Sequence, residues 1–314
     1  MNNTPSHAWA CVHSARGPAL RAIRHANDLS AMSGSIHSKA RLPVTALDLS
    51  EQLRHVNGID LHITEAGSGE PLLMLHGVTV DATAQRYEIE TLADSYRVIA
   101  PDLRGHGRST RPTAFTLRDH VDDMIALLDA LGIARTAVLG VSMGSYVAQA
   151  LALAVPQRVQ KMILVVATSH GTTSSSARVL AEHADELRDL SREEQQQWLS
   201  ARMFAPETPE SVRQQVRDWF ISRHDLGLAM SAEQIEAANN AVVGFDFRAE
   251  LPALDIPTLL ISGRHDILNP PAEGERIAGL LPSAQIEVFE HSGHLPSLEE
   301  PQHYVASIRT FLAE

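Results

Sequence analysis

A serine lies between two glycines in the stretch Gly140-Val141-Ser142-Met143-Gly144. An apolar run, residues 136–139, precedes this pentapeptide, and an alanine-rich helical pattern, residues 146–153, follows it. Gly-x-Ser-x-Gly between a strand and a helix is typical of a nucleophile elbow, a strained turn that presents the serine hydroxyl at the start of the helix. By itself the pentapeptide also fits a plain structural turn.

A serine hydroxyl is a weak nucleophile unless a base takes its proton and a carboxylate orients that base. After a nucleophile elbow the acid should come first and the histidine last, each just beyond the carboxyl end of a late strand. Asp266 follows the apolar run 259–262, and His294 follows the run 285–289. The order and the setting predict that Ser142, Asp266 and His294 form a catalytic triad.

Simpler roles exist for two members of this set. Asp266 could cap the helix that is expected to begin near Pro271. The chain contains 16 histidines, and His291 is the nearest rival to His294 for the role of base. We favour His294, because the Ser292-Gly293 that follows His291 indicates a strand end there and not an exposed loop tip.

A serine nucleophile also needs backbone amides that stabilise the negative charge on the attacked carbonyl oxygen. One should be the amide of Met143, the residue after the serine. The second should come from the loop after the third strand, here His76 to Thr79, and we assign it to Val78. His76 itself is expected to be structural and to hydrogen-bond within its loop.

The elements that must position these residues follow a regular pattern. Apolar strand-like runs at 71–75, 96–100, 136–139, 162–166, 258–262 and 285–289 alternate with helical patterns. This alternation predicts an α/β fold whose mostly parallel sheet is covered by helices on both faces. The runs 52–56 and 59–63 flank Asn57-Gly58, which predicts an antiparallel hairpin at the start.

Residues 169–250 interrupt the alternation, because strand-like runs give way to polar helical stretches such as 191–204 and 209–224. We interpret them as a helical cap over the carboxyl ends of the strands, where open α/β sheets bind ligands. The expected organisation is therefore a core of residues 46–168 and 251–314, with the cap inserted at 169–250.

Composition narrows the class of function. Lys and Arg total 26 against 38 Asp and Glu, so the net charge of −12 disfavours nucleic acid and anionic membranes as partners. No apolar run is long enough to span a membrane. The one cysteine, Cys11, lies outside the core, which excludes disulfides, thiolate catalysis and cysteine-bound metal there.

Residues 1–45 are basic and poor in acidic residues, and we expect a functionally silent tail. An organelle transit segment, or sequence upstream of a start at Met32, would have a similar composition. We expect a cytoplasmic protein.

Several motifs together resemble the α/β-hydrolase superfamily: Leu75-His76-Gly77, the stretch 101–109, the serine pentapeptide, residues 263–266, and Gly293-His294. The resemblance implies an eight-stranded sheet with an antiparallel second strand, a helical cap after strand 6, and a Ser-His-Asp triad. It also implies that Asp102, Arg104 and His106 belong to a structural turn near the site.

Within that superfamily, residues 294–301 and 241–257 are similar to those of 3-oxoadipate enol-lactonases and related small esterases. Two positions depart from that branch, since Ser145 replaces a usual glycine and Thr79 replaces a commoner small residue. A serine nucleophile distinguishes the chain from haloalkane dehalogenases and epoxide hydrolases, which use aspartate at this position.

The expected function is hydrolysis of a small carboxylic ester or lactone through an acyl-enzyme, without a metal or an organic cofactor. Two kinds of alternative stay open. The same triad could catalyse cofactor-free perhydrolysis or C–C bond cleavage, or the chain could be a ligand-binding receptor with negligible turnover. Substrate identity and oligomeric state are left open by the sequence.

Overall fold

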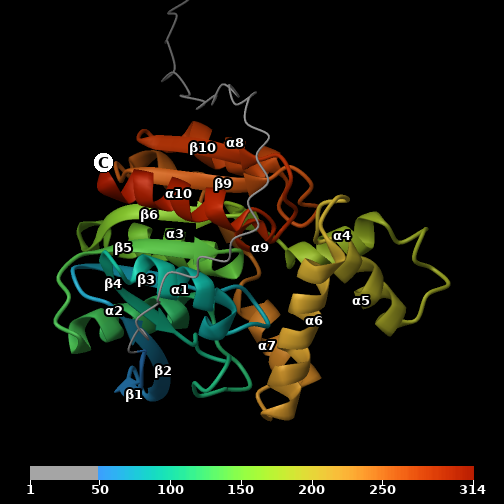
Figure 1. Cartoon of the computed structure of the whole chain (residues 1–314), viewed down its shortest axis with the longest axis horizontal. Helices are drawn as coiled ribbons and strands as arrows, with labels where there is room; N and C mark the ends of the chain where they lie inside the picture. The colour runs from blue at the N-terminus through green and yellow to red at the C-terminus, as the bar shows by residue number, and fades with distance from the viewer. Residues whose placement is uncertain (1–48) are drawn as a thin grey trace, which may run out of the picture.

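The computed structural model describes residues 49–314, so the tail predicted for residues 1–45 lies outside the described residues. An eight-stranded sheet forms the centre of the molecule, in the order β1-β2-β4-β3-β5-β6-β9-β10 (Figure 1). Non-consecutive neighbours such as β2 and β4 show that the chain crosses over the sheet between strands.

The first two strands, β1 (Ser50–Val56) and β2 (Ile59–Ala66), form the antiparallel hairpin predicted around Asn57-Gly58. Both turn residues have positive φ, 48° for Asn57 and 75° for Gly58. Asparagine and glycine tolerate this conformation better than other residues, which is why the dipeptide marks the turn. β2 also pairs antiparallel with β4.

All other strand pairs in the large sheet are parallel. The strands are β3 (Glu70–Leu75), β4 (Tyr96–Pro101), β5 (Thr136–Val141), β6 (Val159–Val165), β9 (Thr258–Gly263) and β10 (Ala284–Phe289). The predicted fold class is thus confirmed, including the antiparallel second strand. Parallel alignment brings the carboxyl ends of these strands to one edge of the sheet.

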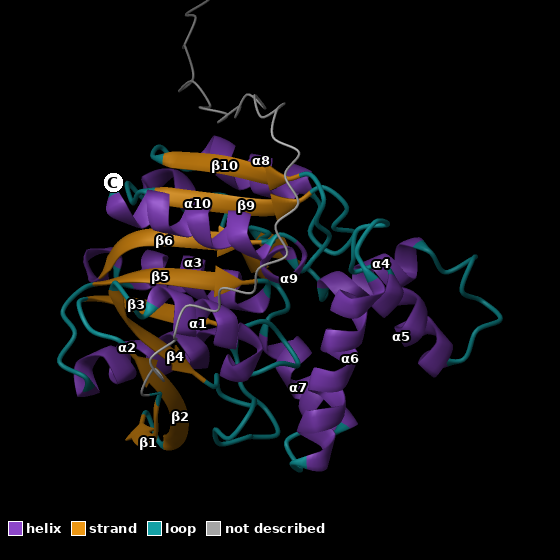
Figure 2. Ribbon diagram, viewed as in Figure 1, coloured by secondary structure: helices purple, strands orange, loops and turns teal. Residues whose placement is uncertain are grey.

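Helices cover both faces of the sheet, as Figure 2 shows. The buried apolar residues accordingly form two large clusters, one on each side. One face carries α2 (Leu117–Ala130), α3 (Met143–Ala154) and α8 (Pro271–Leu280), and the other carries α1 (Arg86–Leu92) and α10 (Pro301–Ala313). The short helix α9 (Pro296–Glu299) precedes α10.

The chain between β6 and β9 is mainly helical and extends beyond the carboxyl edge of the sheet (Figure 1). It contains α4 (Ser175–Glu182), α5 (Arg192–Ala201), α6 (Glu210–Asp225) and α7 (Ala232–Ala241). The expectation that it holds no strands was wrong in one detail. β7 (His170–Gly171) and β8 (Phe245–Asp246) pair antiparallel at its base.

None of the helices among residues 49–314 is long and apolar enough to cross a lipid bilayer.

Candidate active site

Ser142 lies at the sharp turn between β5 and α3, with φ of 52° and ψ of −116°. Neighbouring strands hold this turn, since the Ser142 amide donates a hydrogen bond of 2.9 Å to the Val165 carbonyl. A Cβ at Gly140 would collide with the Gly144 carbonyl, and one at Gly144 would collide with the Leu75 carbonyl. The two glycines are therefore required by the close approach of the chain, as the elbow pattern predicts.

The structure brings together the three residues predicted to form the triad. Nε2 of His294 is 3.1 Å from Oγ of Ser142, and Nδ1 of His294 is 2.8 Å from Oδ2 of Asp266. An ionised carboxylate only accepts, so Nδ1 carries the hydrogen and Nε2 is free to accept the serine proton. Asp266 and His294 are 3% and 5% exposed, which strengthens both contacts by excluding water.

Asp266 does not cap the helix that follows it. Its Oδ1 instead accepts hydrogen bonds from the amides of Leu268 and Asn269, at 2.8 and 3.1 Å. Helix α8 begins at Pro271 without a side-chain cap. The local turn therefore fixes one carboxylate oxygen and leaves the other for His294.

The loop that carries His294 is fixed by the helical insertion. The His294 amide donates a hydrogen bond of 2.6 Å to the Met203 carbonyl. The Glu299 carboxylate accepts from the amides of Gly293 and Ala205, at 2.8 and 2.7 Å. Sequence reasoning did not identify Glu299, because an acidic residue on a short helix carries no signal of this long-range contact.

The rival base His291 is exposed, and its ring is 3.0 Å from Oε1 of Glu207. This contact raises the pKa of His291. An exposed histidine paired with a surface carboxylate has an ordinary surface role, whereas the ring of His294 is held between Ser142 and Asp266.

The loop after β3 passes beside the serine. A Cβ added to Gly77 would lie 3.6 Å from Cβ of Ser142. Met143 is the first residue of α3, so its amide has no carbonyl ahead of it within the helix. Val78 follows Gly77 directly in this loop. The assignment of the Met143 and Val78 amides as oxyanion donors stays a prediction.

His76 hydrogen-bonds within its loop, as expected. Nδ1 donates to the Gly77 carbonyl at 2.7 Å, and Nε2 accepts from the Leu103 amide at 2.9 Å. Burial lowers the pKa of His76, so the ring stays neutral, as these two bonds require. Both ring nitrogens of His76 are thus hydrogen-bonded to backbone groups, as expected for a structural residue.

The turn after β4 is built from buried polar contacts. Asp102 accepts from the amides of Ala82 and Arg108, each at 2.9 Å. Arg104 donates to Asp123 through both Nε and Nη2, and His106 bonds the Arg104 carbonyl. These contacts support the structural role that the resemblance implies for Asp102, Arg104 and His106.

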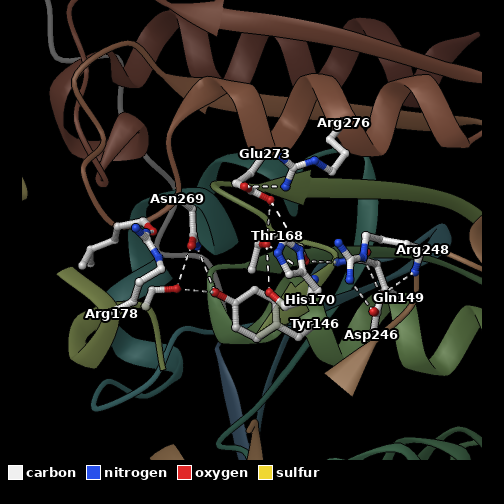
Figure 3. Close-up of polar contacts among 12 residues, drawn as sticks. Tyr146, Gln149, Thr168, His170, Arg178, Asp246, Arg248, Asn269, Glu273 and Arg276 are labelled. Atoms are coloured by element: carbon white, nitrogen blue, oxygen red, sulfur yellow. Dashed lines mark hydrogen bonds and ion pairs between the residues drawn. The ribbon is translucent and has the colours of Figure 1, made fainter. Parts of the chain in front are cut away.

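A second polar group adjoins the triad, and sequence reasoning missed it. The side chain of Asn269 contacts Tyr146 on α3, the Val166 carbonyl after β6, and Ser175 at the start of α4. Figure 3 shows Asn269 and Tyr146 pointing toward each other. An asparagine before a proline indicates only a turn, so the sequence offered no signal for this cluster.

Among residues 49–314, no group of three or more His, Cys, Asp or Glu side chains is arranged to hold a metal ion.

Comparison with known proteins places these features in a family. Residues 70–301 match the model of the alpha/beta hydrolase fold. The chain is 30% identical over 255 residues to the pimeloyl-[acyl-carrier protein] methyl ester esterase of Nitrosomonas europaea, covering 78% of this chain and 97% of that one. It is 31% identical over 265 residues to the 2-hydroxymuconate semialdehyde hydrolase of Pseudomonas sp., covering 82% and 92%.

The resemblance to enol-lactonases is also confirmed. The chain is 29% identical over 236 residues to 3-oxoadipate enol-lactonase 2 of Acinetobacter baylyi, covering 74% of this chain and 84% of that one. Among solved structures, a thermophilic esterase from Thermogutta terrifontis is similar with a TM-score of 0.71 and 29% identity. The match covers 84% of this chain and 98% of the esterase. The chain therefore belongs to the alpha/beta hydrolase fold family.

Proposed function

We propose that this protein hydrolyses a small carboxylic ester or lactone through an acyl-enzyme on Ser142. The observation that carries the proposal is the continuous contact from Asp266 through His294 to Ser142 at a strained strand-to-helix turn. Membership of a hydrolase family supports it, as do relatives named as a methyl ester esterase and an enol-lactonase.

In the first step, His294 takes the proton of the Ser142 hydroxyl through Nε2 while Oγ attacks the substrate carbonyl carbon. Asp266 holds the tautomer and stabilises the imidazolium ion that forms. The amides of Met143 and Val78 donate to the oxygen that becomes negatively charged. One such donor contributes on the order of 3 kcal/mol to the transition state.

The tetrahedral intermediate then collapses, and His294 gives its proton to the leaving alcohol oxygen. A water molecule takes the place of the alcohol, loses a proton to His294, and attacks the acyl group on Ser142. Collapse of the second intermediate releases the carboxylic acid and restores the Ser142 hydroxyl. For a lactone, alcohol and acid are parts of one product.

Replacement of the nucleophile tests the proposal. Ser142→Ala should abolish turnover of short-chain 4-nitrophenyl esters and labelling by a fluorophosphonate, because both need the serine oxygen. The matched control is Ser200→Ala, which removes an exposed hydroxyl on α5 and should leave both signals unchanged. Turnover or labelling that persists in Ser142→Ala would refute the assignment.

Cleavage of a C–C bond by the same three residues is a second candidate, favoured by the similarity to the 2-hydroxymuconate semialdehyde hydrolase. A vinylogous 1,5-diketone and an ester of matched size separate the two reactions. Under our proposal, kcat/KM for the ester exceeds kcat/KM for the diketone, and both fall in Ser142→Ala.

A further inference from the structure

Tyr146 lies in the first turn of α3, four residues after Ser142, which directly precedes the helix. The Tyr146 side chain is buried, with 6% of its surface exposed. Its ring packs against Phe245, with ring centroids 4.9 Å apart. Packing therefore holds the phenol in place and leaves its hydroxyl near the carboxyl ends of β6 and β9.

The side-chain amide of Asn269 determines that the Tyr146 oxygen accepts a hydrogen bond. Nδ2 of Asn269 is 2.6 Å from the Val166 carbonyl oxygen, which can only accept, so the orientation of the amide is determined. Nδ2 also donates to the Tyr146 oxygen at 2.9 Å. Oδ1 accepts from Oγ of Ser175 at 2.7 Å. Figure 3 shows this cluster around Asn269.

The Tyr146 oxygen therefore accepts a hydrogen bond from Asn269. The hydroxyl can still donate its own hydrogen to another acceptor. Ser175 gives only a long contact of 3.4 Å. The contacts with Ser175 and Asn269 oppose the effect of burial on the pKa of Tyr146. Burial dominates and raises the pKa of Tyr146, so the phenol stays protonated at neutral pH.

The hydroxyl lies away from the expected oxyanion donors. Val78 follows β3, and β3 borders β5 on one side. Val166 and Asn269 follow β6 and β9, on the other side of β5. A substrate whose carbonyl oxygen meets the β3 loop would therefore bring a different atom to Tyr146.

We propose that the Tyr146 hydroxyl donates a hydrogen bond to a second oxygen of the substrate, outside the ester group that Ser142 attacks. The inference rests on the function proposed above and narrows its substrate class to esters or lactones with an additional ether, carbonyl or hydroxyl oxygen. With the all-carbon analogue bound, the Tyr146 hydroxyl keeps only its long 3.4 Å contact with Ser175 as an acceptor, so the site favours the oxygen-containing ester.

Asn269 is a positioning residue in this arrangement. Its side chain holds the Tyr146 hydroxyl, while its backbone amide donates to Asp266 at 3.1 Å. Ser175 begins α4 and donates to Oδ1 of the Asn269 side chain, so Asn269 also joins the helical insertion to Asp266. Asn269→Leu removes the side-chain contacts but keeps the backbone amide, and it should reproduce the selectivity change of Tyr146→Phe.

Matched substrate pairs test the role of Tyr146. In the acyl arm the pair is the 4-nitrophenyl ester of 3-methoxypropanoic acid and that of pentanoic acid. In the alcohol arm the pair is 2-methoxyethyl butanoate and butyl butanoate. Each pair exchanges one ether oxygen for a methylene group. Because Tyr146→Phe keeps the ring that packs on Phe245, the variant removes only the hydroxyl.

The expected result is a loss of about three- to tenfold in kcat/KM for the oxygen-containing member of one pair, as for a single neutral hydrogen bond. Its all-carbon partner should change less than twofold. Tyr304→Phe is the matched control, since it removes another buried tyrosine hydroxyl, on α10, that has no hydrogen-bond partner. Tyr304→Phe should leave kcat/KM unchanged for both members of each pair.

Two outcomes would overturn the inference. An equal loss for both members of each pair would mean that Tyr146 acts through Ser142 or the fold. No loss for any substrate would mean that the hydroxyl meets no substrate atom.

A binding measurement separates this inference from the proposed function. Kd values for the same pairs are compared in Ser142→Ala, with and without Tyr146→Phe, by calorimetry. If the wild-type protein hydrolyses no ester, the proposed function fails, but the binding result still decides the role of Tyr146. Tighter binding of an oxygen-containing ester that depends on Tyr146 supports the inference, and equal affinities contradict it.

Discussion

At Ser142 the backbone is held in a conformation that few residues other than glycine adopt, with φ of 52°. Such strain costs on the order of 1–3 kcal/mol and persists only where the surroundings enforce it. Here the Val165 carbonyl fixes the turn, and Gly140 and Gly144 leave room for it. The need for these two glycines could be predicted from the sequence, because a side chain at either position would collide with neighbouring backbone atoms.

The carboxylate of Asp266 is predicted to act through His294, and Asp266→Asn tests this. The change keeps the size of the side chain but reverses the hydrogen bond to Nδ1, which favours the wrong tautomer. The kcat for ester hydrolysis should fall by about 10⁴-fold while the melting temperature changes little. Asp185→Asn, at a side chain that is 96% exposed, is the control. A loss below tenfold would exclude Asp266 as the orienting acid.

At the scale of single elements, the sequence predicted the helix cap and the hairpin turn, because both depend on contacts between neighbouring residues. Thr116 caps α2 and forms a capping box with Asp119, as the sequence indicates. Asn57-Gly58 turns the first hairpin. The small ribbon of β7 and β8 was missed, because strands of two residues have no periodicity to detect. Its pairing depends on contacts between segments about 75 residues apart.

Helix α1 carries a buried acid, Glu88, which packs near α10. Burial raises the pKa of Glu88 from 4.5 to about 7. Between these values the unfolded chain releases a proton that the folded protein keeps, so the free energy of unfolding falls as pH rises. The total loss is on the order of 3 kcal/mol and does not grow above pH 7.

Glu88→Gln removes this titration and is predicted to be more stable than wild type at pH 8. The difference in urea midpoint should grow as pH rises from 4.5 to 7 and then stay constant. Glu90→Gln, on the exposed side of the same helix, is the control. A stability difference independent of pH would show that Glu88 does not titrate in this window.

At the scale of the whole molecule, the helical insertion contacts the loop that carries His294. Met203 accepts from the His294 amide, and Glu299 joins Ala205 to Gly293. The sequence predicted an insertion near the carboxyl edge of the sheet, and helices α4–α7 lie there. The domain limits of 169–250 stay a prediction. Contacts such as Glu299 with Ala205 depend on the folded chain and could not be predicted from local patterns.

Glu299→Ala is predicted to loosen this contact, because two buried amides lose a charged acceptor. We expect a loss of roughly 2–3 kcal/mol in the free energy of unfolding and a lower kcat for ester hydrolysis. Glu236→Ala, at an exposed position on α7, is the control for both measurements. If Glu299→Ala unfolds at the same urea concentration as wild type, the contact does not stabilise the fold.

The central claim is that Ser142 carries the acyl group during turnover, and mass spectrometry of a trapped intermediate tests it most directly. The enzyme is mixed with an excess of a 4-nitrophenyl ester, quenched in acid within milliseconds, and digested. The account predicts the added acyl mass on the peptide that contains Ser142, and no such adduct in Ser142→Ala. Rapid ester turnover with the acyl mass on another residue would contradict the account.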